Sequence, residues 1–121
     1  MHDILRFWLA RGADGLRMDV TNLISKPWGL DGRLPDAPVV QPGRLQPAFA
    51  RGVHRPQLMA HLAEMKAEGL QHHDLLTVGE APLCTPAQAR EITDPEHGAL
   101  DMVFQFEHMD RTASPVPANG R

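Results

Sequence analysis

Two carboxylates stand where the chain could bring them together for chemistry. Asp19 lies near the end of residues 15–20, and Glu80 ends residues 74–80. Arg17 precedes Asp19 by two positions, so on a strand both side chains project to the same side. Two carboxyl groups at one edge of a sheet suit cleavage of a glycosidic bond, in which one attacks and the other protonates the leaving oxygen. From position alone, Asp19 as a helix cap and Glu80 as a solvated loop residue stay open.

The remaining reactive side chains form no recognisable site. His72 and His73 are neighbours in the chain and would point apart, and His61 lacks a histidine partner four residues along. Cys84 is the single cysteine, so it forms no internal disulfide, and no base lies near it in the sequence. The glycine spacing does not match a phosphate-binding loop. We therefore expect no metal site and no cofactor.

Three short strands are predicted to position the carboxylates. They are residues 15–20, 74–80 and 101–106, each rich in apolar residues with short strand-like patterns. A strand at residues 15–20 would place Arg17 and Asp19 on one face. Parallel strands end at the same edge of a sheet, which is the edge where α/β proteins bind ligands. Asp19 and Glu80 are therefore expected at the ligand-binding edge.

Helical patterns separate these strands. Residues 3–12 carry an apolar stripe, with Asp3 placed to cap the first turn. Residues 56–68 carry a second stripe, and Thr85 with Gln88 forms a capping box that opens a short helix. Helices that alternate with strands are typical of right-handed crossover units around a parallel sheet. The sequence therefore predicts an α/β fold.

Composition narrows the class of protein. The chain has 121 residues, 42% of them hydrophobic, and a net charge of −3. Nucleic-acid binders usually carry a basic surface, and membrane spans need about 18 apolar residues in a row, so neither partner is expected. A cytoplasmic location follows as the default expectation. Residues 26–56 are rich in proline and glycine and are predicted to be a long loop.

Several motifs resemble one enzyme family. Gly-Leu-Arg-Met-Asp-Val at residues 15–20 resembles the fourth-strand region of the α-amylase family, and Thr-Val-Gly-Glu at residues 77–80 resembles its fifth-strand region. Asn-Leu-Ile-Ser-Lys at residues 22–26 and the segment at residues 102–110 are similar to the oligo-1,6-glucosidase and α-glucosidase branch. The motifs stand in the family's order. The resemblance runs from about residue 4 to residue 110.

The resemblance implies part of a (β/α)8 TIM barrel. On this basis residues 1–110 form a partial catalytic barrel domain that covers about strands four to six. Residues 111–121 lack apolar periodicity and are expected to be a disordered tail outside the family. The family's first-strand, third-strand and seventh-strand motifs, and with them its third catalytic carboxylate, have no counterpart here. We therefore expect an incomplete barrel that is inactive as an isolated fragment.

The resemblance also implies a role for each site residue. Asp19 would be the nucleophile that forms a covalent glucosyl-enzyme, and Glu80 the general acid and then the base. Arg17 would hold Asp19 ionised and oriented. Val20 would border the pocket for the second sugar, where valine accompanies cleavage of α-1,6 bonds. The implied substrate is an isomaltose-like or maltose-like oligosaccharide, cleaved with retention of configuration.

Two other functions stay open. A sucrose isomerase or transglucosidase of the same branch would use the same covalent intermediate and pass the glucosyl group to a sugar instead of water. A non-catalytic, amylase-like interaction module would keep the fold without the chemistry, although such modules tend to lose the carboxylates that Asp19 and Glu80 represent. The oligomeric state is left open.

Overall fold

A three-stranded parallel sheet forms the frame of the protein in the computed structural model, which describes residues 1–36, 39–46, 49–106 and 109. The strands are β1 (Gly15–Met18), β2 (Leu76–Ala81) and β3 (Met102–Gln105), with β2 in the middle. Met18 pairs with Gly79, and Glu80 pairs with Phe104. The predicted parallel α/β arrangement is confirmed. The strand bounds differ, because β1 ends one residue before Asp19 and β2 continues one residue beyond Glu80.

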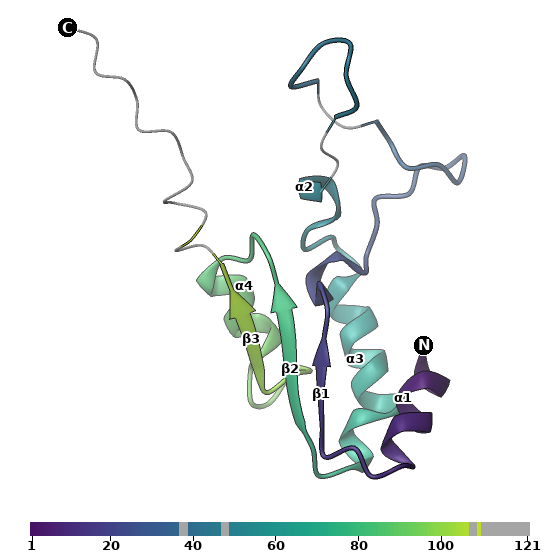
Figure 1. Ribbon diagram of the computed structural model, residues 1–121, viewed down its shortest axis with the longest axis vertical. Helices are drawn as coiled ribbons and strands as arrows, with labels where there is room; N and C mark the ends of the chain where they lie inside the picture. The colour runs from purple at the N-terminus through teal and green to yellow at the C-terminus, as the bar shows by residue number, and fades with distance from the viewer. Residues whose placement is uncertain (37–38, 47–48, 107–108, 110–121) are drawn as a thin grey trace, which may run out of the picture.

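Four α-helices in the described residues accompany the sheet, and all but the short α2, which lies beyond the arrowheads, lie behind or beside it in Figure 1. They are α1 (His2–Leu9), α2 (Phe49–Gly52), α3 (Leu58–Glu68) and α4 (Pro86–Ile92), with two short 3-10 helices, η1 (Thr21–Leu23) and η2 (Leu70–His72). At α4 the predicted capping box is present: the Thr85 hydroxyl accepts from the Gln88 amide, and the Gln88 side chain accepts from the Thr85 amide. Both reciprocal bonds satisfy N–H groups that a helix start leaves unpaired.

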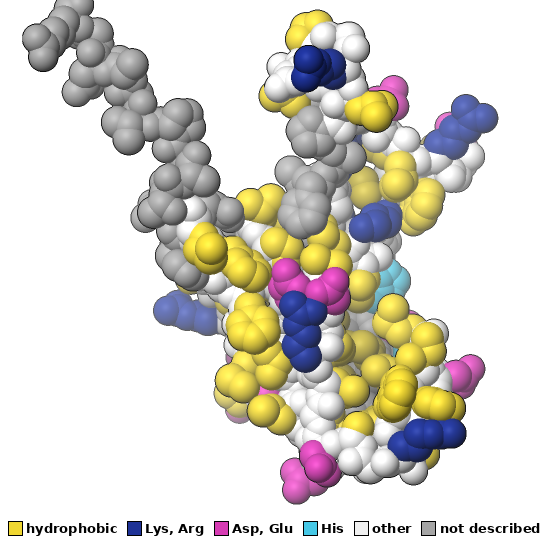
Figure 2. All heavy atoms as spheres, viewed as in Figure 1, with side chains coloured by type: hydrophobic (Ala, Val, Ile, Leu, Met, Phe, Trp, Pro, Cys, Tyr) yellow, Lys and Arg dark blue, Asp and Glu magenta, His cyan; other side chains and the backbone are white. Residues whose placement is uncertain are grey.

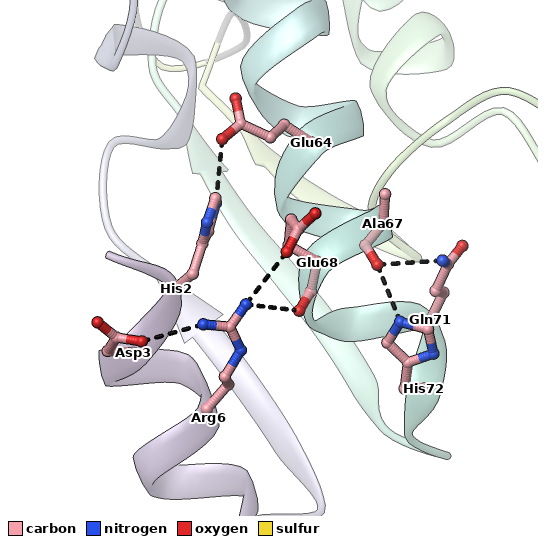
Figure 3. Close-up of polar contacts among 8 residues, drawn as sticks. All are labelled: His2, Asp3, Arg6, Glu64, Ala67, Glu68, Gln71 and His72. Carbon is pink, nitrogen blue, oxygen red and sulfur yellow. Dashed lines mark hydrogen bonds and ion pairs between the residues drawn. The ribbon is translucent and has the colours of Figure 1, made fainter.

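Polar contacts join α1 to α3 (Figure 3). Arg6 binds the Glu68 carboxylate at 3.1 Å and also the Asp3 carboxylate at 3.0 Å. His2 lies 3.7 Å from a carboxylate oxygen of Glu64. The cap expected at Asp3 is wrong, because Met1 is the residue that precedes the helix and Asp3 lies inside the first turn. Instead, the negative charge of Asp3 stabilises the positive end of the helix dipole, and its carboxylate pairs with Arg6.

The core lies between the helices and one face of the sheet. Its buried residues come from α1, α3, η2, β2, α4 and the segments that flank β2 and β3: Leu5, Leu58, Leu62, Met65, Leu70, Ala81, Cys84, Ile92, Ala99 and Leu100. Half of the α1 stripe behaves as predicted, since Leu5 and Leu9 are buried, whereas Ile4 and Trp8 are exposed. The opposite face of the sheet carries exposed apolar side chains from Met102 and Phe104. One face of the sheet is therefore covered and the other is open.

The long connection predicted at residues 26–56 contains the short helix α2 and otherwise turns and irregular backbone. It lies beyond the arrowheads of the strands in Figure 1, at the carboxyl ends of β1 and β2. Within the described residues, no helix has the length and apolar character needed to cross a membrane. The tail predicted at residues 111–121 lies outside the described residues.

Candidate active site

One arginine joins the two carboxylates that the sequence singled out. Arg17, on β1, donates from Nη1 to Oδ1 of Asp19 and from Nη2 to Oε2 of Glu80, the latter at 2.5 Å. Both carboxyl groups therefore lie within the width of a single guanidinium, at the same end of neighbouring strands. Figure 2 shows acidic and basic side chains meeting in the middle of the open face, bordered by hydrophobic ones. The predicted clustering of Arg17, Asp19 and Glu80 is present in the structure.

The two carboxylates have different surroundings. The Asp19 side chain is 72% exposed, whereas that of Glu80 is 21% exposed. Glu80 lies on the central strand and is flanked by β1 and β3, whereas Asp19 follows an edge strand. The site thus contains one solvent-exposed and one largely shielded carboxyl group. In enzymes with two catalytic carboxyl groups, such a difference in environment accompanies their separate roles as nucleophile and acid.

Arg17 keeps Asp19 ionised. The pKa of Asp19 lies below its ordinary value of 3.8, first because Arg17 donates a hydrogen bond to it and second because of a hydrogen bond with Glu80. In return, the hydrogen bond to Asp19 raises the pKa of Arg17 above its ordinary value. A carboxylate that stays charged at neutral pH is available as a nucleophile.

The turn after β1 aims Asp19 at its neighbours. Val20 has left-handed backbone angles, φ 36° and ψ 46°, which end the strand and start η1. A β-branched residue is rarely found in this region, and such strain concentrates at functional sites. Val20 is half-buried and lies beyond the end of β1, so the strand expected over residues 15–20 stops before it.

Two buried residues that sequence reasoning did not assign to the site fix this turn against β2. Asn22, fully buried, donates to the carbonyl of Pro82 at 2.7 Å, and so links the segment after Asp19 to the segment after Glu80. Thr21 donates to the Met18 carbonyl at 3.1 Å and lies against Gly79. Asn22 belongs to the motif at residues 22–26, but its contact joins positions 60 residues apart, so spacing alone gave no signal for it.

Metal ligands do not gather in the part of the chain that the structure describes. No three His, Cys, Asp or Glu side chains there are close enough to hold an ion. Cys84 is buried, and burial raises the pKa of its thiol, so it is a poor nucleophile. The chemistry available at the described site is that of two carboxylates and one guanidinium.

Comparison with known proteins places this geometry in a family. The family model for the α-amylase catalytic domain matches residues 1–119. The chain belongs to the α-amylase family. It is 40% identical over 118 residues to the oligo-1,6-glucosidase of Parageobacillus thermoglucosidasius, a match that covers 95% of this chain and 20% of the relative. The chain therefore spans about a fifth of the length of the curated relatives it matches.

Solved structures of the α-amylase family have the same fold. A variant of the Bacillus licheniformis trehalose-6-phosphate hydrolase superposes with a TM-score of 0.70 at 35% identity, covering 90% of this chain and 18% of that one. The isomaltulose synthase of Protaminobacter rubrum superposes with a TM-score of 0.62 at 30% identity, covering 87% and 18%. The predicted partial (β/α)8 barrel is confirmed. In such barrels the site lies at the carboxyl ends of the strands, where Asp19 and Glu80 are found.

Proposed function

We propose that this α-amylase family chain carries the nucleophile and the acid/base of a retaining α-glucosidase. The observation that carries the proposal is the shared guanidinium of Arg17, which holds Asp19 and Glu80 side by side. Retaining enzymes need their carboxyl groups about 5–5.5 Å apart, whereas inverting enzymes leave about 6.5–9.5 Å for a water molecule. Contact of both carboxylates with one guanidinium favours the closer arrangement.

Each residue has a role in this proposal. Asp19 attacks the anomeric carbon of a glucose unit and forms a covalent glucosyl-enzyme, while Glu80 protonates the departing oxygen. Glu80 then takes a proton from the incoming water, which releases glucose with its configuration retained. Arg17 keeps the attacking carboxylate charged and oriented. Glu80 is the less exposed of the two carboxyl groups, and in this proposal it carries the proton for the leaving oxygen.

The substrate we propose is an oligosaccharide with α-1,6-linked or α-1,4-linked glucose, consistent with relatives named oligo-1,6-glucosidase. Val20, in the turn beside Asp19, is proposed to border the pocket for the second sugar. Its branched apolar side chain takes up space and offers no hydroxyl, which favours the α-1,6 linkage. A methyl-for-hydroxyl change in a pocket alters discrimination by about 1–3 kcal/mol, or roughly ten- to two-hundredfold.

A glucosyl-transferring isomerase is the second candidate, supported by the similarity to an isomaltulose synthase. It shares the covalent intermediate and differs in what accepts the glucosyl group, so product analysis separates the two. A non-catalytic module is disfavoured because Asp19, Glu80 and Arg17 are all present and in contact. The cytoplasmic location stays a prediction.

The test uses a chimera, because the chain spans a fifth of its relatives. Residues 1–106 replace the matching segment of the Parageobacillus thermoglucosidasius oligo-1,6-glucosidase, and hydrolysis of isomaltose, maltose and sucrose is followed by product analysis. We expect Asp19→Asn and Glu80→Gln each to lower kcat/KM by several orders of magnitude. Asp14→Asn, at the opposite end of β1, is the matched control and should leave activity nearly unchanged. Full activity without Asp19 would overturn the proposal.

The Val20 proposal has its own comparison in the same chimera. Val20→Thr adds a hydroxyl without changing the branching, so the ratio of kcat/KM for isomaltose to that for maltose should fall roughly tenfold or more. An unchanged ratio would make Val20 a packing residue of the turn. The isolated 121-residue chain is expected to release no nitrophenol from an aryl α-glucoside above the level of its Asp19→Asn variant.

A further inference from the structure

The long connection between η1 and α3 encloses two adjoining hollows. The smaller has a volume of about 270 Å³ and the larger about 760 Å³. Lys26 and Pro27 line both, Arg51 lines the smaller, and Arg55 and His61 line the larger. Both hollows are lined by residues that follow β1 in the chain, and the connection that carries them lies beyond the strand arrowheads in Figure 1. Their combined size suits a small molecule.

The charge in these hollows is one-sided. Three cations, Lys26, Arg51 and Arg55, line them, and no aspartate or glutamate does. This cluster of positive charge occurs in a chain whose net charge is −3. Among the described residues, no carboxylate lies within ion-pair distance of the three cations, whereas Arg6 and Arg17 are each paired.

Lys26 is held in place by a backbone carbonyl, and two arginine donors have no acceptor within the described part of the chain. The Lys26 ammonium donates to the carbonyl of Leu23 and packs against Gly52, at the junction of the two hollows. The Nε atoms of Arg51 and Arg55 are buried, and neither has a hydrogen-bond partner within the described part of the chain. Buried donors are almost always paired in folded proteins, so these two Nε–H groups are suited to donate to a ligand oxygen.

We propose that the two hollows form a site for the phosphate group of a small phosphorylated compound, such as a sugar phosphate. A phosphate carries close to two negative charges at neutral pH and presents several acceptor oxygens. Arginine forks bind phosphate oxygens in pairs, and the lysine adds a compact charge between them. Trp28, 63% exposed, lines the larger hollow and gives the organic part of the ligand an aromatic wall. The site uses neither Asp19 nor Glu80 and does not depend on the proposed glucosidase activity.

Fluorescence of Trp28 reports on binding in the full chain. Trp8, on α1, is replaced by phenylalanine so that Trp28 is the sole tryptophan. Inorganic phosphate, glucose 6-phosphate and glucose are titrated separately, with chloride at the same ionic strength as the reference. We expect saturable signals with phosphate and glucose 6-phosphate and none with glucose or chloride. Tighter binding of glucose 6-phosphate identifies a sugar phosphate as the ligand, whereas equal or tighter binding of inorganic phosphate indicates a free-phosphate site.

Single substitutions locate the site. Loss of one charged hydrogen-bond donor should weaken phosphate binding by about tenfold or more in Arg51→Gln and in Arg55→Gln. Arg90→Gln, which removes an exposed cation on α4 away from the hollows, is the matched control and should bind like the parent. Circular dichroism establishes that each variant keeps its helices. Absence of a saturable phosphate signal, or an equal loss in Arg90→Gln, would overturn the proposal.

Discussion

Gly79 on β2 allows the turn after Asp19 to pack closely against the strand that carries Glu80. The Gly79→Ala variant tests how close this packing is. A methyl carbon at Gly79 would lie 2.7 Å from Cδ1 of Leu100 and 2.9 Å from Oγ1 of Thr21, both closer than real contacts allow. The Leu100 side chain can rotate at its tip. Thr21 is 3% exposed and bonded to the Met18 carbonyl, so it moves only if the turn after Asp19 moves. Overpacking of this kind costs about 1–3 kcal/mol of unfolding free energy.

The chain offers a matched substitution at Gly69. A methyl carbon there would meet its nearest atoms at 3.5 Å and 3.9 Å, which is ordinary contact. Gly69→Ala should leave stability unchanged or raise it by roughly 0.4–1 kcal/mol through the unfolded state. Urea unfolding followed by circular dichroism compares the two variants. Adding Leu100→Val to Gly79→Ala removes one close contact and should recover part of the loss.

Equal stability of the Gly79→Ala and Gly69→Ala variants would refute the reasoning. It would mean that the turn after β1 is not pressed against β2, and that the spacing of the two carboxylates has another cause. No recovery on adding Leu100→Val would assign the cost to Thr21 alone.

Three further outcomes are expected. Arg17→Gln should return the pKa of Asp19 towards its ordinary value of 3.8, which carboxyl-carbon NMR can measure. Because Arg17 lowers that pKa in the parent chain, the ion pair is present above pH ~3.8. It is lost as the pH falls through the lowered pKa. An unchanged titration would mean that Arg17 does not act on Asp19. Asn22→Ala should cost about 1–3 kcal/mol in urea unfolding, because it leaves the part-buried Pro82 carbonyl without its partner, and a loss below about 0.5 kcal/mol would dismiss that link. Thr85→Ala should cost about 1 kcal/mol through loss of the cap, whereas Thr85→Ser should not.

Local patterns in the sequence were sufficient to predict the parallel frame and the pairing of Arg17 with Asp19. Alternation along residues 15–20 placed Arg17 and Asp19 on one side, and the structure pairs them. The capping box at Thr85 was predicted because all its parts lie within four residues. These features depend on short-range geometry, which a sequence states directly.

The features that were missed depend on contacts between distant residues. β1 stops at Met18 because Val20 turns left-handed, and its β-branched side chain argues against that conformation locally. Asn22 acquires its role from a carbonyl 60 positions away. Ile4 and Trp8 belong to the apolar stripe of α1, but both are exposed. The stripe itself does not specify which element, if any, covers it.

The unequal exposure of the two carboxylates follows from their places in the sheet. Glu80 lies on the central strand, where β1 and β3 exclude water from both sides, and Asp19 follows a strand with one free edge. In a closed barrel that edge pairs with another strand, which removes solvent from Asp19 as well. The attraction between Arg17 and Asp19 would then act in a lower dielectric and strengthen. The described residues therefore bring the three charged groups together, and closure of a barrel around them would make the site drier.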